Sequence, residues 1–332
     1  MPTLHLLRLH IQALFFRTLQ RIFTTLDLSY SHPLPKPHSF IRTIPSTHSK
    51  TLGSIDLFFY TSASHKSPPS SPEVGVKERR PLLVNFHGGG YAIGHARDDA
   101  RFFTAITSST NTLVVSVNYR LAPSHPFPTA IEDGVSAVLY LWEHADELGI
   151  DVEKTVISGF SAGGALAYGV SIKLAQVLEG MGGKGGSGGM LRGLVVFYGG
   201  CDFTLSRAEK DASNKNLIPV IPPMLYRFFD SSYLQGNPDK LDPLLSPGLA
   251  DDEILRKGIP ENVAMVNCGG DQLLAESTRF GERLKGLGKS VEVLVVEGVG
   301  HAWDKKASWK KGNAKRDEAY RFAVENLKEM WS

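Results

Sequence analysis

Residues 155–164, TVISGFSAGG, are the most informative stretch of this chain. The first four are rich in β-branched side chains, which is typical of a strand, and the apolar residues after Gly163 read as a buried helix. Between them, residues 159–163 have the form G-x-S-x-G. At a sharp strand-to-helix turn the serine is strained and exposed, and glycines are needed because side chains would clash. Since the helix N-terminus also favours developing negative charge, the pattern indicates nucleophilic chemistry at Ser161.

A G-x-S-x-G pentapeptide alone is a modest signal, because glycine-rich helix starts are often only close packing. Residues 87–90, HGGG, strengthen it, since they follow an apolar run that reads as a buried strand feeding a loop. Acyl transfer needs backbone N–H groups aimed at a tetrahedral oxyanion. We expect these donors from Gly89, Gly90 and Ala162, with Gly88 a further candidate. The glycines lack the Lys-Ser/Thr pair of a phosphate loop.

Downstream of Ser161, an acid and a histidine each follow a predicted strand. Asp271 comes shortly after residues 262–267, and His301 comes shortly after residues 291–296. In an open parallel sheet the carboxyl ends of the strands share one crevice, so we expect the three side chains to meet. Their chain order is that of the α/β-hydrolase triad, in which serine attacks, histidine moves the proton and the acid orients the imidazole.

Other roles stay open for these positions. Asp271 also suits the N-cap of the helix that follows it. Glu276, inside that helix, is a fallback acid, and Asp202 is a weaker rival after an earlier strand. A lone histidine is more often structural, but the place of His301 after the last strand favours it over the other histidines.

Taken together, the motifs resemble those of the hormone-sensitive-lipase-like esterases. The resemblance runs from about Leu52 to the C-terminus and rests on these segments: HGGG at 87–90, NYRLAP at 118–123, HPFP at 125–128, GFSAGG at 159–164, and Asp271-x-Leu273-x-x-Glu276 with His301. It implies an α/β-hydrolase fold, no cofactor or metal, and hydrolysis of carboxylic esters with short or medium acyl chains. It also implies a cap built from the N-terminal helices and an insertion after the sixth strand.

Three sites depart from the family pattern. Phe160 stands where the family usually has Asp, Ser124 stands where it usually has Glu, and Ala302-Trp303 follow His301 where Gly-Phe is common. None of these changes removes a reacting group. Phe160 and Ser124 do replace polar side chains expected near the site.

Composition narrows the class of protein. The chain has 332 residues, 42% of them hydrophobic, and a formal net charge of +2 with acids and bases spread throughout. This argues against a nucleic-acid partner, which would need a basic face. Cys201 and Cys268 read as buried thiols without a disulfide or metal framework, which suits a reducing compartment such as the cytoplasm.

Alternating strand and helix patterns predict a mostly parallel, eight-stranded sheet with helices on both faces. Strands are expected near 39–44, 54–60, 81–86, 113–117, 155–158, 191–198, 262–267 and 291–296. Helices are expected near 98–109, 129–148, 161–179, 272–287 and 312–330. We therefore expect one α/β-hydrolase domain over residues 1–332, with a helical cap from about 1–45 and 203–240.

The N-terminal residues 3–28 read as an amphipathic helix with apolar side chains at helical spacing, three arginines and no acid before Asp27. The arginines interrupt it too often for a transmembrane span. A cap helix whose apolar face lines the acyl pocket is favoured. The alternative is a basic helix that contacts a membrane surface, which would make the protein membrane-associated or organellar.

The second cap segment contains residues 222–229, PPMLYRFF, which are aromatic and broken by proline. The predicted substrate contacts are Tyr91, Phe160, Met224, Tyr226 and Phe228, although core packing explains the last three equally well.

These features predict a serine carboxylesterase that hydrolyses short- to medium-chain esters of small molecules through Ser161, His301 and Asp271. An alternative within the same fold is a biosynthetic thioesterase, deacetylase or lyase acting on one metabolite. A remote alternative is a non-catalytic ligand-binding receptor, which the presence of His301 disfavours.

Overall fold

The structure is a computed structural model that describes residues 2–61, 79–182, 191–307 and 312–332. Its centre is one eight-stranded sheet in the order β1-β2-β4-β3-β5-β6-β7-β8. The strands are β1 (Phe40–Pro45), β2 (Ser54–Tyr60), β3 (Arg80–Phe86), β4 (Leu113–Asn118), β5 (Ile150–Phe160), β6 (Leu191–Phe197), β7 (Asn262–Cys268) and β8 (Ser290–Val296). β2 runs antiparallel to β1 and β4, and the other neighbouring pairs are parallel. The predicted mostly parallel α/β-hydrolase sheet is confirmed.

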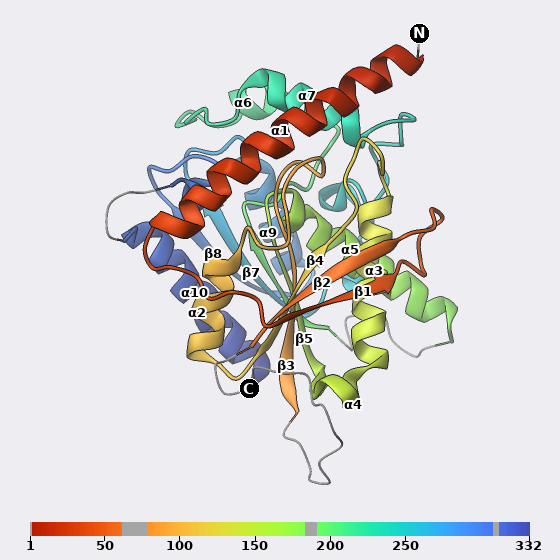
Figure 1. Cartoon of the computed structure of the whole chain (residues 1–332), viewed down its shortest axis with the longest axis vertical. Helices are drawn as coiled ribbons and strands as arrows, with labels where there is room; N and C mark the ends of the chain where they lie inside the picture. Colours follow the sequence, from red (N-terminus) through yellow and green to blue (C-terminus); the bar gives the residue numbers. More distant parts are fainter. Residues whose placement is uncertain (1, 62–78, 183–190, 308–311) are drawn as a thin grey trace.

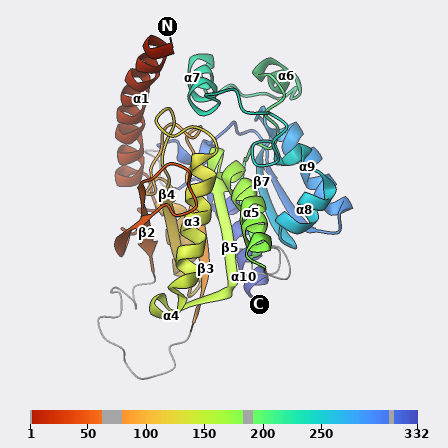
Figure 2. The ribbon, with the colours of Figure 1, turned by 90° about the vertical axis from the view of Figure 1, so that its right-hand side faces the viewer.

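Helices cover both faces of this sheet (Figure 1, Figure 2). One apolar core lies between the sheet and α3 (Thr129–Glu143), α5 (Ala162–Gly180), α8 (Asp252–Gly258) and α9 (Leu274–Gly286). The other lies beneath α2 (Ala100–Ser109) and α10 (Ala314–Trp331). The central strands are apolar on both sides because both sides are buried, as parallel strands require. The single helix expected over 129–148 divides into α3 and the short α4 (Ala145–Leu148).

Three further helices lie together at one end of the molecule: α1 (Pro2–Tyr30), α6 (Arg207–Ala212) and α7 (Pro223–Tyr233). In Figure 1 they lie across the top, and Figure 2 shows α7 between α1 and α6. The turn from β5 into α5 lies at this end, because Ser161 lines the same cavity as residues of α6 and α7. The predicted cap boundary at about residue 45 needs correction, because Phe40–Pro45 pair with β2 as an edge strand of the sheet.

Polar contacts fasten α1 to the body of the protein. Arg17 donates from Nε and Nη2 to the carbonyl oxygens of Ala92 and Ala122, at 2.9 and 2.8 Å. Near the end of the helix, buried Asp27 accepts from Nη1 of Arg101 at 2.8 Å. Charge-assisted bonds of this kind are stronger than neutral ones, so α1 is held along the surface. Among the described residues, no helix is both long and apolar enough to cross a membrane.

Candidate active site

Ser161 occupies the turn between β5 and α5 with φ 55° and ψ −118°, a conformation that non-glycine residues rarely adopt. The flanking glycines allow the turn. A Cβ on Gly159 would lie 2.0 Å from the carbonyl oxygen of Gly163, and one on Gly163 would lie 2.0 Å from that of Phe86. The backbone segments at these glycines therefore lie so close to neighbouring backbone that no side chain fits. The tight turn raises the serine hydroxyl above the end of the strand.

Loops after β7 and β8 bring an acid and a histidine to this serine. Oγ of Ser161 lies 2.7 Å from Nε2 of His301, and Nδ1 of His301 lies 2.6 Å from Oδ2 of Asp271. The other carboxylate oxygen, Oδ1, accepts from the backbone N–H of Leu273 at 3.1 Å. Asp271 and His301 are both buried, so little water reaches the bond between them. The structure therefore joins the three predicted side chains in one chain of hydrogen bonds.

The rival acids have other partners. Glu276 accepts from the backbone N–H of Cys201 at 2.8 Å and pairs with Nζ of Lys210 at 2.6 Å. Asp202 accepts from the backbone and hydroxyl of Thr204. The N-cap residue of α9 is Leu273 rather than Asp271, because Asp271 lies in the loop before the helix.

The HGGG loop packs against the serine turn. A Cβ on Gly88 would lie 2.9 Å from the carbonyl oxygen of Phe160, and Gly89 and Gly90 have φ values of 116° and 56°. A Cβ on Gly90 would lie 2.2 Å from the ring of Phe229. A side chain at position 88 would therefore clash with the serine turn, and one at position 90 would clash with Phe229. Gly90 and Ala162 line the same cavity as Ser161, whereas Gly88 and Gly89 do not.

His87 supports this loop from behind. Its ring stacks on Tyr119 with centroids 4.3 Å apart, and Nδ1 lies 2.8 Å from the carbonyl oxygen of Gly88. Because a carbonyl only accepts, Nδ1 is the donor. Burial lowers the pKa of His87 to about 4, so its ring is neutral at pH 7. The side chain holds the loop by packing and hydrogen bonding.

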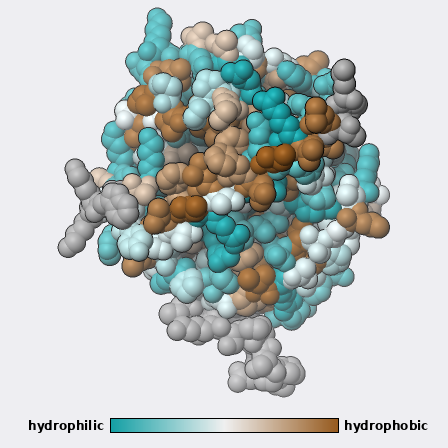
Figure 3. All heavy atoms as spheres, turned by 45° about the horizontal axis from the view of Figure 1, so that its top comes forward, coloured by the Kyte–Doolittle hydropathy of each residue, from teal (hydrophilic) through white to brown (hydrophobic). Residues whose placement is uncertain are grey.

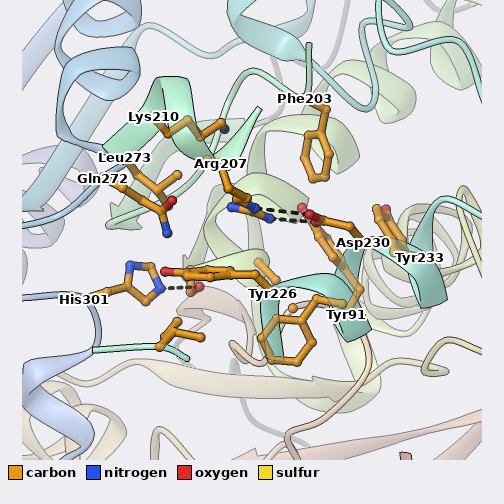
Figure 4. A pocket seen from close by; sticks show the side chains of 16 residues that line it. Tyr91, Phe203, Arg207, Lys210, Tyr226, Asp230, Tyr233, Gln272, Leu273 and His301 are labelled. Atoms are coloured by element: carbon orange, nitrogen blue, oxygen red, sulfur yellow. Dashed lines mark hydrogen bonds and ion pairs between the residues drawn. The ribbon is translucent and has the colours of Figure 1, made fainter. Parts of the chain in front are cut away.

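A cavity opens in front of Ser161 and His301 (Figure 4). Its walls are largely aromatic: Tyr91, Phe203, Tyr226, Phe229 and Tyr233. Tyr91 and Tyr233 stack with their ring centroids 3.7 Å apart. Burial raises the pKa of the Tyr91 and Tyr226 phenols, so both stay neutral. Tyr226 and His301 also line a second, adjoining cavity walled by residues 217–221.

Charged side chains line the cavity as paired groups. Arg207 binds Asp230 through Nη2 and Nε at 2.7 and 3.2 Å, and Figure 4 shows this pair projecting from α6 and α7. Lys210 is neutralised by Glu276. The cavity thus combines aromatic walls with positively and negatively charged side chains that can form hydrogen bonds.

The structure corrects three of the predicted substrate contacts. Tyr91 and Tyr226 line the cavity, but Met224 is exposed and absent from its walls. Phe228 is buried against Phe16 of α1, with ring centroids 5.0 Å apart. Phe160 lies in the core beneath α2 and α10, because successive side chains of a strand alternate between faces.

Sequence reasoning missed most of the cavity wall: Phe203, Arg207, Lys210, Phe229, Asp230, Tyr233, Gln272 and Leu273. A usable signal was present in α7, where residues 226, 229, 230 and 233 follow the spacing of one helix face. Among the residues that the structure describes, none that lines either cavity belongs to α1. The expectation that its apolar face lines the acyl pocket is therefore wrong. The apolar residues of the predicted repeat, from Leu4 to Phe15, are exposed, and Phe16 on the opposite face packs on α7.

The unusual Phe160 covers a buried ionic cluster. Nζ of Lys305 lies 3.7 Å from the centre of the Phe160 ring and pairs with Asp99 at 2.7 Å and Asp304 at 3.1 Å. Burial disfavours the ammonium, but the two carboxylates outweigh it and hold the pKa of Lys305 well above its ordinary value. A cation over an aromatic face is favourable, so Phe160 is the apolar partner of this cation.

The other two departures have simpler surroundings. Oγ of Ser124 lies 3.3 Å from Nε2 of His10 and so contacts α1 rather than the reacting groups. Trp303 is buried against Tyr198, whose ring also meets His301 at a centroid distance of 4.9 Å. The histidine loop therefore rests on aromatic packing.

Comparison with known proteins agrees with this geometry. A family model described as α/β hydrolase fold matches residues 83–305. An AB hydrolase superfamily protein of Schizosaccharomyces pombe is 30% identical over 260 residues, which are 78% of this chain and 71% of that protein. The esterase LipI of Mycobacterium tuberculosis is 30% identical over 240 residues, 71% of this chain and 68% of that one.

Among solved structures, the thermophilic carboxylesterase EstE1 from a metagenomic library superposes with a TM-score of 0.74 at 24% identity, covering 98% of both chains. At this identity the structural likeness establishes the fold, and the family model and the sequence relatives establish the family. The chain therefore belongs to the hormone-sensitive-lipase-like esterases of the α/β hydrolase fold, a family of carboxylic ester hydrolases.

Proposed function

We propose that this protein is a serine carboxylesterase that works through an acyl-enzyme. The observation that carries the proposal is the hydrogen-bonded chain from Ser161 through His301 to Asp271 at the wall of a cavity. Nε2 of His301 takes the hydroxyl proton as Oγ attacks the ester carbonyl carbon, and it then gives that proton to the departing alkoxide. Water repeats the sequence on the acyl-enzyme and releases the acid.

The oxyanion of each tetrahedral intermediate would bind beside the HGGG loop. Gly90 and Ala162 support this, because both line the cavity with Ser161. We propose their backbone N–H groups as donors, with Gly89 as the third. Each such donor contributes about 3 kcal/mol to lowering the barrier.

We propose esters of small molecules with short or medium acyl chains as substrates. The cavity supports this choice, since aromatic rings bound it and the ion pair between Arg207 and Asp230 interrupts its apolar surface. A long alkyl chain would have to bury those charges against hydrocarbon, which is costly. Cys201 and Cys268, which are buried and form no disulfide, suit a reducing compartment such as the cytoplasm.

The test is covalent labelling combined with a substrate series. A fluorophosphonate probe should label Ser161, Ser161→Ala should abolish labelling, and the exposed Ser124→Ala should leave it intact. Hydrolysis of p-nitrophenyl esters by Ser161→Ala should fall by several orders of magnitude, on the order of 10⁶-fold. Full turnover by Ser161→Ala would exclude the mechanism. A preference for acyl thioesters over oxygen esters in the same assay would favour the thioesterase alternative.

A further inference from the structure

The helix α1 has two apolar faces. The inner face, which includes Leu9, Ala13 and Phe16, packs on the body and on α7. Half a helical turn away lies a second row, here called the outer stripe: Leu4, Leu7, Ile11, Leu14, Phe15 and Ile22. Each of these side chains is between 52 and 74% exposed. A cap helix that only covered the cavity would need the inner face alone.

The outer stripe is a continuous apolar surface from Leu4 to Phe15, and Ile22 extends it on the same face beyond Thr18. Its members are spaced so that they follow one line along a helix with 3.6 residues per turn. Figure 3 shows a band of hydrophobic residues crossing the molecular face over which α1 runs. Single exposed apolar residues are ordinary, but a contiguous exposed patch of this kind marks a surface that binds a partner or a membrane.

The charges beside the outer stripe indicate which partner fits. Arg8 and Arg21 are exposed and lie on its two sides, and residues 2–26 contain no aspartate or glutamate. Two copies of the chain packed through this stripe would bring arginines together without a carboxylate between them. An anionic lipid surface satisfies both features, because its headgroups attract the arginines while the acyl region accepts the apolar side chains.

We propose that α1 docks this protein on anionic membrane surfaces through the outer stripe, lying parallel to the surface. The inner face keeps its contacts with the body in this arrangement, including the bonds from Arg17 to Ala92 and Ala122. Phe16 of α1 packs on Phe228 of α7, and α7 supplies much of the cavity wall. Docking would thus hold the cavity close to the lipid, where apolar esters concentrate.

The test is flotation of the full-length protein with vesicles of two compositions, phosphatidylcholine alone and phosphatidylcholine mixed equally with phosphatidylglycerol. We expect binding to the anionic vesicles, weaker by on the order of tenfold for the neutral ones, and weakened by salt. Ile11→Ser/Leu14→Ser should abolish binding. Arg8→Gln and Arg21→Gln should each weaken it by about fivefold.

The matched control replaces exposed leucines away from α1, Leu52→Ser/Leu241→Ser, and should bind like the wild type. All variants should hydrolyse a soluble short-chain ester at the wild-type rate, because this assay measures the activity of the catalytic site independently of membrane binding. Failure of the wild type to float with anionic vesicles would overturn the proposal, as would wild-type flotation by Ile11→Ser/Leu14→Ser. If the wild type is a dimer in light scattering, Ile11→Ser/Leu14→Ser is a monomer and the wild type does not bind vesicles, the stripe serves self-association instead.

Discussion

Replacing Asp271 by asparagine separates orientation of the histidine from its presence. Oδ1 of the new amide can keep the bond from Leu273 N–H, and its NH₂ group then faces Nδ1 of His301 in place of Oδ2. Because an NH₂ group donates, it favours the tautomer with hydrogen on Nε2, which can no longer accept the proton of Ser161. The side chain of His301 is only 7% exposed, so water cannot easily restore the correct arrangement. We expect kcat to fall by about 10⁴-fold, equivalent to about 5.5 kcal/mol.

Glu276→Gln is the matched control, since it removes the charge of the rival acid of the same motif. It leaves the ammonium of Lys210 buried without its carboxylate, which should lower the free energy of unfolding by about 3–5 kcal/mol. Its effect on kcat should stay within about tenfold at temperatures where the protein is folded.

The assay is steady-state hydrolysis of p-nitrophenyl butyrate beside urea unfolding for both variants. Asp271→Asn should lose activity with little loss of stability, and Glu276→Gln should do the reverse. The opposite pattern would show that Glu276 is the functional acid. Mild effects on kcat in both variants would refute the triad as the source of activity.

Three further predictions concern the loop, the ionic cluster and pH. The pKa of His87 is about 4 in the folded protein, below its usual 6.5, so its contribution to the free energy of unfolding is complete above pH 6.5 and is lost as the pH falls towards 4. In urea titrations, His87→Gln should reduce the loss of unfolding free energy between pH 7 and pH 5 by about 2 kcal/mol. An equal loss in both proteins would contradict this. Lys305→Met should cost about 3–5 kcal/mol of stability, because it leaves Asp99 and Asp304 buried without their cation; a calorimetric melting temperature like that of the wild type would exclude such a role. Gly90→Ala forces a Cβ into the ring of Phe229 and should lower kcat by about 10²-fold with KM little changed, whereas an unchanged kcat would remove Gly90 from the proposed donors.

Local pattern was enough to predict much of the site. The strands before Ser161, Asp271 and His301 could be recognised from their apolar runs, and parallel strands end at a common edge. The three side chains are thus expected together from sequence, and in the structure His301 lies 2.7 Å from Ser161 and 2.6 Å from Asp271. Asp271 is favoured over Glu276 from sequence because it directly follows a strand, whereas Glu276 lies inside the next helix; in the structure Asp271 contacts His301 and Glu276 contacts Lys210.

Direction was harder to predict than position. Phe160 is one residue from Ser161 in sequence, yet it lies in the core beneath α2 and α10, since strand side chains alternate between faces. In α7, Tyr226 faces the cavity, whereas Met224 and Phe228 do not. The helical spacing groups Tyr226 with residues 229, 230 and 233, but which face of α7 meets the cavity depends on how α7 packs on α1.

The sequence by itself determined the sheet, the chain order of Ser161, Asp271 and His301 after their strands, and the glycine turns around Ser161. These features depend on short-range periodicity and on turns that only glycine allows. Tertiary structure alone decided what lines the cavity and that α1 has an outward apolar face. Such features depend on the packing of segments far apart in the chain, and the same amphipathic pattern is compatible with either side facing in. The contacts of Phe16 and Arg17 settle that choice for α1 and leave the outer stripe in solvent.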